Sequence, residues 1–270
     1  MTSVPPKPVF RYDVAATQRQ LTTLKYYVGA IDGARGPSLR SAVMAFQKVQ
    51  GIGADGIVGP STLAALAKPT SPTLRGNAPA NRVEIDLTKQ VLYVVKGGAV
   101  SRIMPVSSGN GATYSQKSGG TAKALTPAGY FTIQRRIIGE RKADLGTLYD
   151  PQYFYRGWAI HGSNSVPARP ASHGCVRVTR PDGKYLLKAL TVGMSVYLYG
   201  GSYTFTAGSK APGTDNPTGD TASDAPIEPT PTASPTPSKT ASPSPSASPT
   251  ASASTPPSGS TSPSPSPTTG

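Results

Sequence analysis

Three stripes of apolar residues at helical spacing predict three short helices within residues 12–68. Each stripe places its large side chains on one face, as in a helix that packs on one side only. At this size the core of such a domain is thin. The stripes consist of Leu21, Leu24 and Val28, then Leu39, Val43 and Phe46, and then Leu63 and Leu66.

A repeated turn separates these helices. The segment Asp32-Gly33-Ala34-Arg35-Gly36-Pro37 recurs as Asp55-Gly56-Ile57-Val58-Gly59-Pro60. Glycine allows a tight turn, and proline is favoured at the first position of a helix. We therefore expect a three-helix domain over residues 12–68, in which the two aspartates are turn residues rather than ligands.

Residues 81–200 carry the pattern of a β domain. Val83, Ile85 and Leu87 alternate with other residues, which is the spacing of a strand. Many strands and few helices predict a mainly β, sandwich-like domain with one core. Further strands are expected at residues 91–95, 100–106, around 131–133 and at 194–199, with a short helix at 182–189 and a polar, Gly-rich loop over the active site at 109–124.

Two proline-rich segments flank this β domain. Residues 69–80 form a linker between the helical and β domains. Residues 208–270 consist mostly of Pro, Ser, Thr and Ala, with almost no apolar surface to bury, and we expect a disordered tail. The tail could serve as an extended spacer, an O-glycosylated stalk or a passive flexible segment.

The chain is basic, with 27 Lys and Arg against 13 Asp and Glu and a formal net charge of +14. Acids outnumber bases in the tail, so the positive excess lies upstream of it. A basic body suggests a polyanionic partner, either a nucleic acid or an anionic cell wall. No nucleic-acid motif and no basic-aromatic run is present, which favours the wall or plain surface solvation over nucleic acid.

The single cysteine and both histidines of the chain fall within residues 161–175. The two segments are Ile160-His161-Gly162-Ser163-Asn164 and Ser172-His173-Gly174-Cys175-Val176-Arg177. A thiolate is a strong nucleophile, and imidazole is the side chain best able to exchange protons near neutral pH. The clustering indicates an active site with a cysteine nucleophile.

Each neighbour of Cys175 has a chemical use in such a site. His161 is further away in sequence than His173 and can fold back as the base, while Arg177 adds a charge that favours the thiolate. Gly174 allows a tight turn, and N–H groups around Gly174 and Cys175 are candidates for an oxyanion hole.

Two other interpretations of this segment were weighed. A buried structural cysteine with two hydrogen-bonded histidines is the first, and the clustering argues against it. A zinc site is the second, but no nearby carboxylate completes a set of four ligands, because the next acid is Asp182. We therefore expect neither a metal nor a cofactor.

These segments closely resemble the active-site signature of the L,D-transpeptidases, the YkuD-type family of enzymes that cross-link peptidoglycan. Upstream segments resemble the family's opening strands and its Thr-Pro-x-Gly turn, and the resemblance covers about residues 81–200. The upstream segments are Val83–Leu87, Gln90–Val94 and Thr126–Phe131.

The resemblance implies a two-step acyl transfer. Cys175 would attack the carbonyl of the third residue of a tetrapeptide donor stem, D-alanine would leave, and a thioester would remain. A side-chain amine of an acceptor stem would then form a 3-3 cross-link. His161 would act as general base and acid, oriented by a backbone carbonyl near Gly162.

The remaining site residues would build the pocket. Ser172 and His173 would shape it and its hydrogen-bond network, together with Gly162 and Gly174. Arg177 would either bind a substrate carboxylate or hold the loop.

The repeated Asp-Gly-x-x-Gly-Pro turns resemble those of the small peptidoglycan-binding domain family, and Ala42–Gln47 also fits it. That family binds glycan-peptide in a groove near the turns. A helical domain that packs without a ligand remains the alternative.

Three other functions fit parts of the pattern. An L,D-carboxypeptidase would use the same site and pass the thioester to water. A non-catalytic wall-binding protein would not need His161 and Cys175. In papain-like cysteine proteases the cysteine comes first, whereas here it follows the histidine.

The resemblance implies an extracytoplasmic protein, wall-associated or secreted and monomeric, that contributes to cell wall biogenesis and cell shape. Residues 1–10 contain three prolines and no apolar run, unlike a signal peptide. An extracytoplasmic location would agree with this N-terminus if a signal peptide lay upstream, if the start had been trimmed, or if export used another route. No apolar stretch approaches the ~18 residues of a membrane helix.

Overall fold

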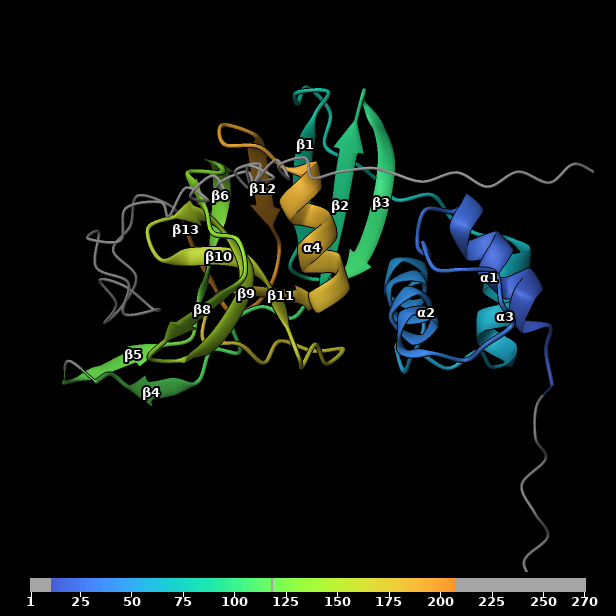
Figure 1. Ribbon diagram of the computed structural model, residues 1–270, viewed down its shortest axis with the longest axis horizontal. Coiled ribbons are helices and arrows are strands. Elements are labelled where there is room, and N and C mark those ends of the chain that lie inside the picture. The colour runs from blue at the N-terminus through green and yellow to red at the C-terminus, as the bar shows by residue number, and fades with distance from the viewer. Residues whose placement is uncertain (1–10, 118, 207–270) are drawn as a thin grey trace, which may run out of the picture. The chain divides into compact units, whose positions relative to one another are not determined.

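The computed structural model describes residues 11–117 and 119–206 (Figure 1). The expected disordered tail, residues 208–270, lies outside the described residues. Within the described residues, no helix is both long enough and apolar enough to cross a membrane.

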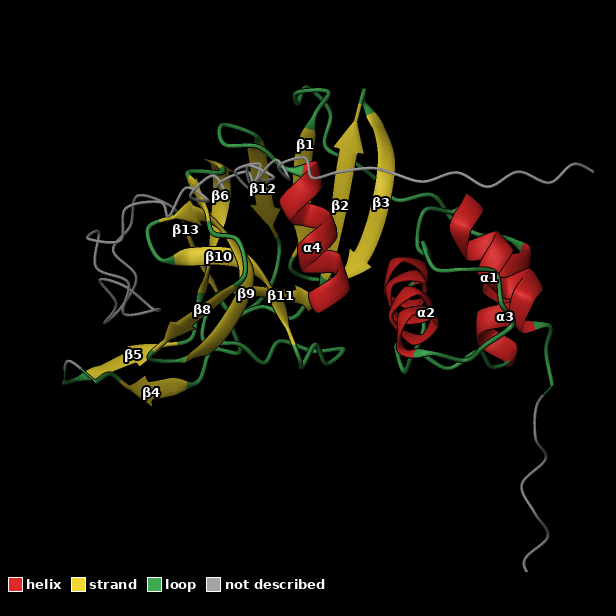
Figure 2. Cartoon of the chain, in the orientation of Figure 1, coloured by secondary structure: helices red, strands yellow, loops and turns green. Residues whose placement is uncertain are grey.

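Three helices form the N-terminal region, as the periodicity predicts (Figure 2). Asp13 caps the first by accepting a hydrogen bond from its third residue (2.9 Å). The second and third each begin with the proline of the repeated turn, and the second ends at Gly51 in the left-handed region (φ 70°). The helices are α1 (Val14–Thr23), α2 (Pro37–Gln50) and α3 (Pro60–Ala67).

A buried glutamine holds each copy of the repeated turn. Gln18 donates to the Asp32 carboxylate (2.7 Å), and Gln47 donates to the Asp55 carboxylate (2.8 Å). The Oε1 atom of each glutamine accepts the N–H of the glycine that follows the aspartate. Both aspartates therefore act as turn residues, as expected.

The first apolar stripe ends earlier than predicted. Lys25 adopts a left-handed φ of 70°, which stops α1, and Val28 lies beyond the helix with 65% of its surface exposed. The main-chain N–H groups of Tyr26 and Tyr27 both donate to Leu21 O, and the two tyrosines are buried. The tyrosine rings thus fill the core position that the pattern assigned to Val28.

The β region contains two main sheets and a separate hairpin. The larger sheet has the order β13-β6-β12-β1-β2-β3, and the second has the order β11-β10-β9-β7 with β8 paired to β9. The hairpin is β4-β5. The strands are β1 (Arg82–Asp86), β2 (Val91–Lys96), β3 (Ala99–Pro105), β4 (Thr113–Ser115), β5 (Thr121–Lys123), β6 (Thr126–Thr132), β7 (Arg135–Arg136), β8 (Glu140–Ala143), β9 (Gly146–Tyr155), β10 (Trp158–Ser163), β11 (Val176–Thr179), β12 (Ser195–Tyr199) and β13 (Thr204–Thr206).

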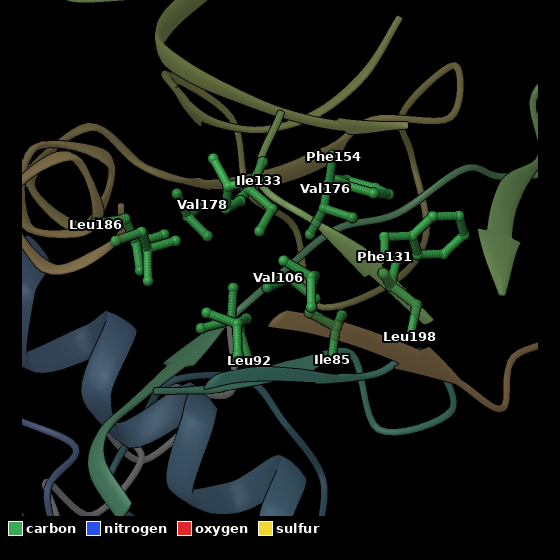
Figure 3. Packing of buried hydrophobic residues seen from close by; sticks show 14 of the residues in the cluster. Ile85, Leu92, Val106, Phe131, Ile133, Phe154, Val176, Val178, Leu186 and Leu198 are labelled. Atoms are coloured by element: carbon green, nitrogen blue, oxygen red, sulfur yellow. The ribbon is translucent and has the colours of Figure 1, made fainter. Parts of the chain in front are cut away.

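One apolar core joins the two main sheets and helix α4 (Arg180–Ala189) (Figure 3). Ile85, Leu92 and Leu198 of the larger sheet pack with Val176 and other residues of the second sheet. This arrangement is the mainly β, sandwich-like domain that the sequence predicts.

The larger sheet is buried on its other face as well. Val91, Tyr93 and Ile103 of β2 and β3 belong to the same apolar cluster as the three helices. Burial on both faces explains why β2 is a continuous apolar run rather than an alternating one. The proline-rich linker follows this surface, since Arg75 N donates to the buried carboxylate of Glu84 (3.1 Å).

The segment 109–124 is not the plain loop that was expected. Thr113–Ser115 and Thr121–Lys123 pair as antiparallel strands, so β4 and β5 form a short hairpin. Its polar, Gly-rich sequence hides the strands because few of its side chains are buried.

Candidate active site

Two parallel strands bring the predicted catalytic pair together. β10 carries His161, and Cys175 directly precedes β11, with Ile160 opposite Val176 in the register. Both side chains are buried, at 6% and 8% exposure, and both line one cavity of about 310 Å³. Ser172, His173 and Arg177 also line this cavity, whereas Gly162 and Gly174 do not.

The turn before Cys175 is held by hydrogen bonds to its own residues. Ser172 Oγ donates to Cys175 O (2.6 Å) and accepts the N–H of Gly174 (3.0 Å). Thr126 Oγ1 donates to Gly174 O (2.7 Å) from β6. These bonds fix the direction in which the cysteine side chain leaves the chain.

Gly174 is required by the conformation and by the space around it. Its φ is +140°, and a Cβ atom there would lie 2.7 Å from Leu125 O and 2.8 Å from Trp158 Nε1. Because its N–H donates to Ser172 Oγ, this group is already occupied in the structure. The sequence suggested that the Gly174 N–H could donate to a substrate oxyanion, but in this structure it donates to Ser172 Oγ instead.

His161 is buried, and its surroundings favour the neutral ring. Its Nδ1 lies 2.9 Å from Gly162 O, so the ring N–H donates there and the lone pair lies on Nε2. Burial lowers the pKa of His161 to about 4, and the charge of Arg177 acts in the same direction. The backbone carbonyl occupies the position that a carboxylate holds in a Ser-His-Asp triad.

Cys175 carries a thiol whose Sγ donates a weak hydrogen bond to Gly157 O at 3.7 Å. Burial lowers the pKa of Arg177, whereas the charge of an ionised Cys175 opposes that shift. Burial raises the pKa of Tyr114, and the Cys175 charge raises it further. The thiolate form of Cys175 would thus lie within electrostatic range of one cation and one phenol.

His173 has a different environment from His161. It is half-buried, and its ring packs edge-on against Tyr114 with centroids 4.9 Å apart. Burial lowers the pKa of His173, and Arg177 lowers it further. The geometry places His173 in the pocket wall, beneath the hairpin strand β4.

Several residues that support the site are not among those predicted from the sequence. Tyr114 is the one aromatic residue in the segment 109–124, which is a signal that could have marked it. Thr126 opens the Thr-Pro-x-Gly turn, so its motif position was also a signal. Nothing local marks Gln90 or Ser108, because their partners lie far away in sequence.

Potential metal ligands were considered within the ranges 11–117 and 119–206 by their grouping. No group of three or more His, Cys, Asp and Glu side chains there could hold a metal ion.

Comparison with known proteins identifies both regions. The L,D-transpeptidase catalytic domain family model matches residues 80–198, and the peptidoglycan binding domain model matches residues 11–66. The chain is similar to an L,D-transpeptidase from Xylanimonas cellulosilytica whose crystal structure covers residues 123–326. The two sequences are 42% identical, and the two structures superpose with a TM-score of 0.67. That match covers 73% of this chain and 100% of the other. The chain belongs to the L,D-transpeptidase family.

A curated relative matches a shorter part of this L,D-transpeptidase family member. The N-acetylmuramoyl-L-alanine amidase CwlM of Mycobacterium tuberculosis is 39% identical over 77 residues. The match covers 28% of this chain and spans 19% of the length of the amidase. Both family assignments connect the chain to peptidoglycan in the cell wall.

Proposed function

We propose that this protein cross-links peptidoglycan stem peptides by 3-3 transpeptidation through a thioester on Cys175. The observation that carries this proposal is the shared cavity, which is lined both by His161 of β10 and by Cys175, the residue directly before the neighbouring strand β11. The Nδ1 bond to Gly162 O directs the basic Nε2 of His161 away from that carbonyl.

The first half-reaction forms the acyl-enzyme. His161 Nε2 takes the thiol proton while Sγ attacks the carbonyl carbon of the third stem residue, which displaces the weak contact to Gly157 O. The carbon–nitrogen bond to D-alanine then breaks, and the imidazolium returns its proton to the leaving amine. Burial, which lowers the pKa of His161 to about 4, favours this return of the proton.

The second half-reaction transfers the acyl group. The side-chain amine of an acceptor stem attacks the thioester carbon and loses a proton to His161, and the thiol leaves. Amide-bond energy is retained in the thioester, so no ATP is needed. Water in place of the amine would give the L,D-carboxypeptidase reaction.

Arg177 has two separate roles in this proposal. Its main chain exchanges both hydrogen bonds with Ser107 (3.0 Å each), which holds the loop. Its side chain lines the cavity, where it would bind a substrate carboxylate.

The helical region would hold the enzyme on its substrate. A cavity of about 350 Å³ is lined by residues of both copies of the repeated turn, such as Arg35 and Ile57, and by Arg40 of α2. Tethering raises the local concentration of stem peptides without new contacts at the active site. We place the protein at the cell wall, outside the cytoplasmic membrane.

Intact-protein mass spectrometry of the full chain with a carbapenem tests the thioester chemistry. Wild type should gain the mass of one carbapenem, and Cys175→Ala should gain none. Circular dichroism is the control that checks whether both proteins are folded. A folded wild type that forms no adduct would overturn the catalytic proposal.

Product analysis with a synthetic tetrapeptide then separates the two reactions. A cross-linked dimer supports transpeptidation. A tripeptide alone, formed with an acceptor amine present, assigns the carboxypeptidase reaction instead.

A further inference from the structure

A buried lysine joins the helical region to the β region. Lys48, in the last turn of α2, is only 7% exposed, and its Nζ donates to Gln90 O (3.0 Å) and Val106 O (3.1 Å). Buried charges carry a large desolvation cost unless they are compensated. Among the residues that the structure describes, no carboxylate lies within ion-pair distance of Lys48, so its partners are the two main-chain carbonyls.

These carbonyls lie where the turn between β1 and β2 meets the end of β3. Gln90 is the last residue of that turn, with a left-handed φ of 57°, and Val106 directly follows β3. Val106 N donates to Gln90 O (2.9 Å), and Lys48 joins both residues from the helical side. The lysine therefore fixes the point at which the chain leaves β3.

The residue after Val106 holds both ends of the active-site loop, residues 169–177. Ser107 exchanges both main-chain hydrogen bonds with Arg177, and its Oγ donates to Arg169 O (2.8 Å). Ser107 is fully buried, so these bonds do not compete with bulk water.

Ser108 holds the middle of the same loop. Its carbonyl accepts the N–H groups of Ala171 and Ser172 (2.9 Å each). The side chain of Gln90 accepts Ser108 N (2.8 Å) and donates to Ser108 Oγ (2.7 Å). Gln90 thus contacts Lys48 through its carbonyl and the active-site loop through its side chain.

We propose that Lys48 is a positioning residue for acyl transfer, acting through Gln90 and residues 106–108 on the loop 169–177 that carries Cys175. The helical region then completes the support of the active site in addition to any binding of peptidoglycan. This inference rests on the proposed function for its kinetic readout, but its structural readout does not depend on activity.

The kinetic test compares Lys48→Met with wild type in carbapenem acylation of the full chain. Methionine fills similar space without the donors, so the loop loses its anchor while the apolar contacts remain. We expect the maximal acylation rate to fall about tenfold, because small displacements of a nucleophile are costly, with the half-saturating concentration within about twofold. The exposed Lys68 offers the matched control, Lys68→Met, which should acylate like wild type.

Rates are normalised to the folded fraction, measured by thermal unfolding at the assay temperature. If the acylation rate of Lys48→Met equals that of wild type after this normalisation, Lys48 contributes only to stability, and the proposal is overturned. Lys48→Arg retains donors and should recover part of the rate, and an arginine variant no faster than the methionine variant also overturns it. Should Lys48→Met not fold, Gln90→Met, which removes the side-chain bonds to Ser108, takes its place with the same expectations.

Hydrogen exchange separates this inference from the proposed function. In Lys48→Met, amides of residues 169–177 should exchange at least about tenfold faster, while amides of α3 stay unchanged. Unchanged exchange in 169–177 would overturn the positioning role even if wild type proved inactive. A wild type without adduct, combined with faster loop exchange in the variant, would overturn only the catalytic proposal.

Discussion

At the scale of single residues, the site depends on a histidine that is kept neutral by burial. His161 has a folded-state pKa of about 4 and an unfolded value of about 6.5. Between these values the unfolded chain binds more protons than the folded one. The free energy of unfolding must therefore fall as the pH drops from about 6.5 toward about 4.

This linkage gives a prediction for His161→Gln, which removes the titrating ring. Between pH 8 and pH 5 the wild type should lose about 2 kcal/mol more of unfolding free energy than the variant. Urea unfolding at both pH values measures the difference, and the remaining titratable groups are common to both proteins. Equal losses in the two proteins would show that His161 is not a buried neutral base.

At the scale of elements, the sequence predicted best where a pattern is local. Pro37 and Pro60 marked the starts of α2 and α3, and the short helix predicted at 182–189 lies within α4. The predicted stripe failed at Val28, because a left-handed Lys25 ends α1 and two tyrosines fill the core. Periodicity alone could not show which side chains would fill that space.

Long-range pairing was beyond the reach of the sequence patterns. The parallel pair β10–β11 brings Cys175 and His161 to the same cavity, and no local spacing encodes that register. The two residues were identified by their chemistry and by family resemblance, whereas supports such as Gln90 and Ser108 became visible only with the fold. Residues 109–124 hid a hairpin because strands that bury few side chains have little apolar pattern.

The hairpin β4–β5 gives a prediction about His173. Tyr114→Ala should remove the ring that covers this histidine, so its pKa should rise toward about 6.5. The chain has two histidines, so NMR titration of the imidazole C–H signals can follow each separately. Tyr114→Phe keeps the ring and should titrate like wild type. An unchanged His173 titration in Tyr114→Ala would mean that the Tyr114 ring does not bury this histidine.

At the scale of the whole molecule, the helical region is proposed to have two functions that different probes can separate. One is the internal contact through Lys48, whose loss should lower the acylation rate with any soluble acyl donor. The other is attachment to insoluble peptidoglycan, which a small carbapenem does not require. A variant of the cavity that both repeated turns line should therefore affect attachment alone.

Ile57→Glu makes this separation, because Ile57 lines that cavity and is 62% exposed, so the fold should tolerate the change. Burying a new carboxylate against a bound glycan-peptide is unfavourable, and we expect about fivefold to tenfold weaker co-sedimentation with purified peptidoglycan. Carbapenem acylation should remain at the wild-type rate.

Ile138→Glu, at 65% exposure in the β region, makes the same change in charge and should co-sediment like wild type. If both variants lose binding equally, attachment follows the net positive charge of the chain rather than this cavity, and added salt should then abolish it.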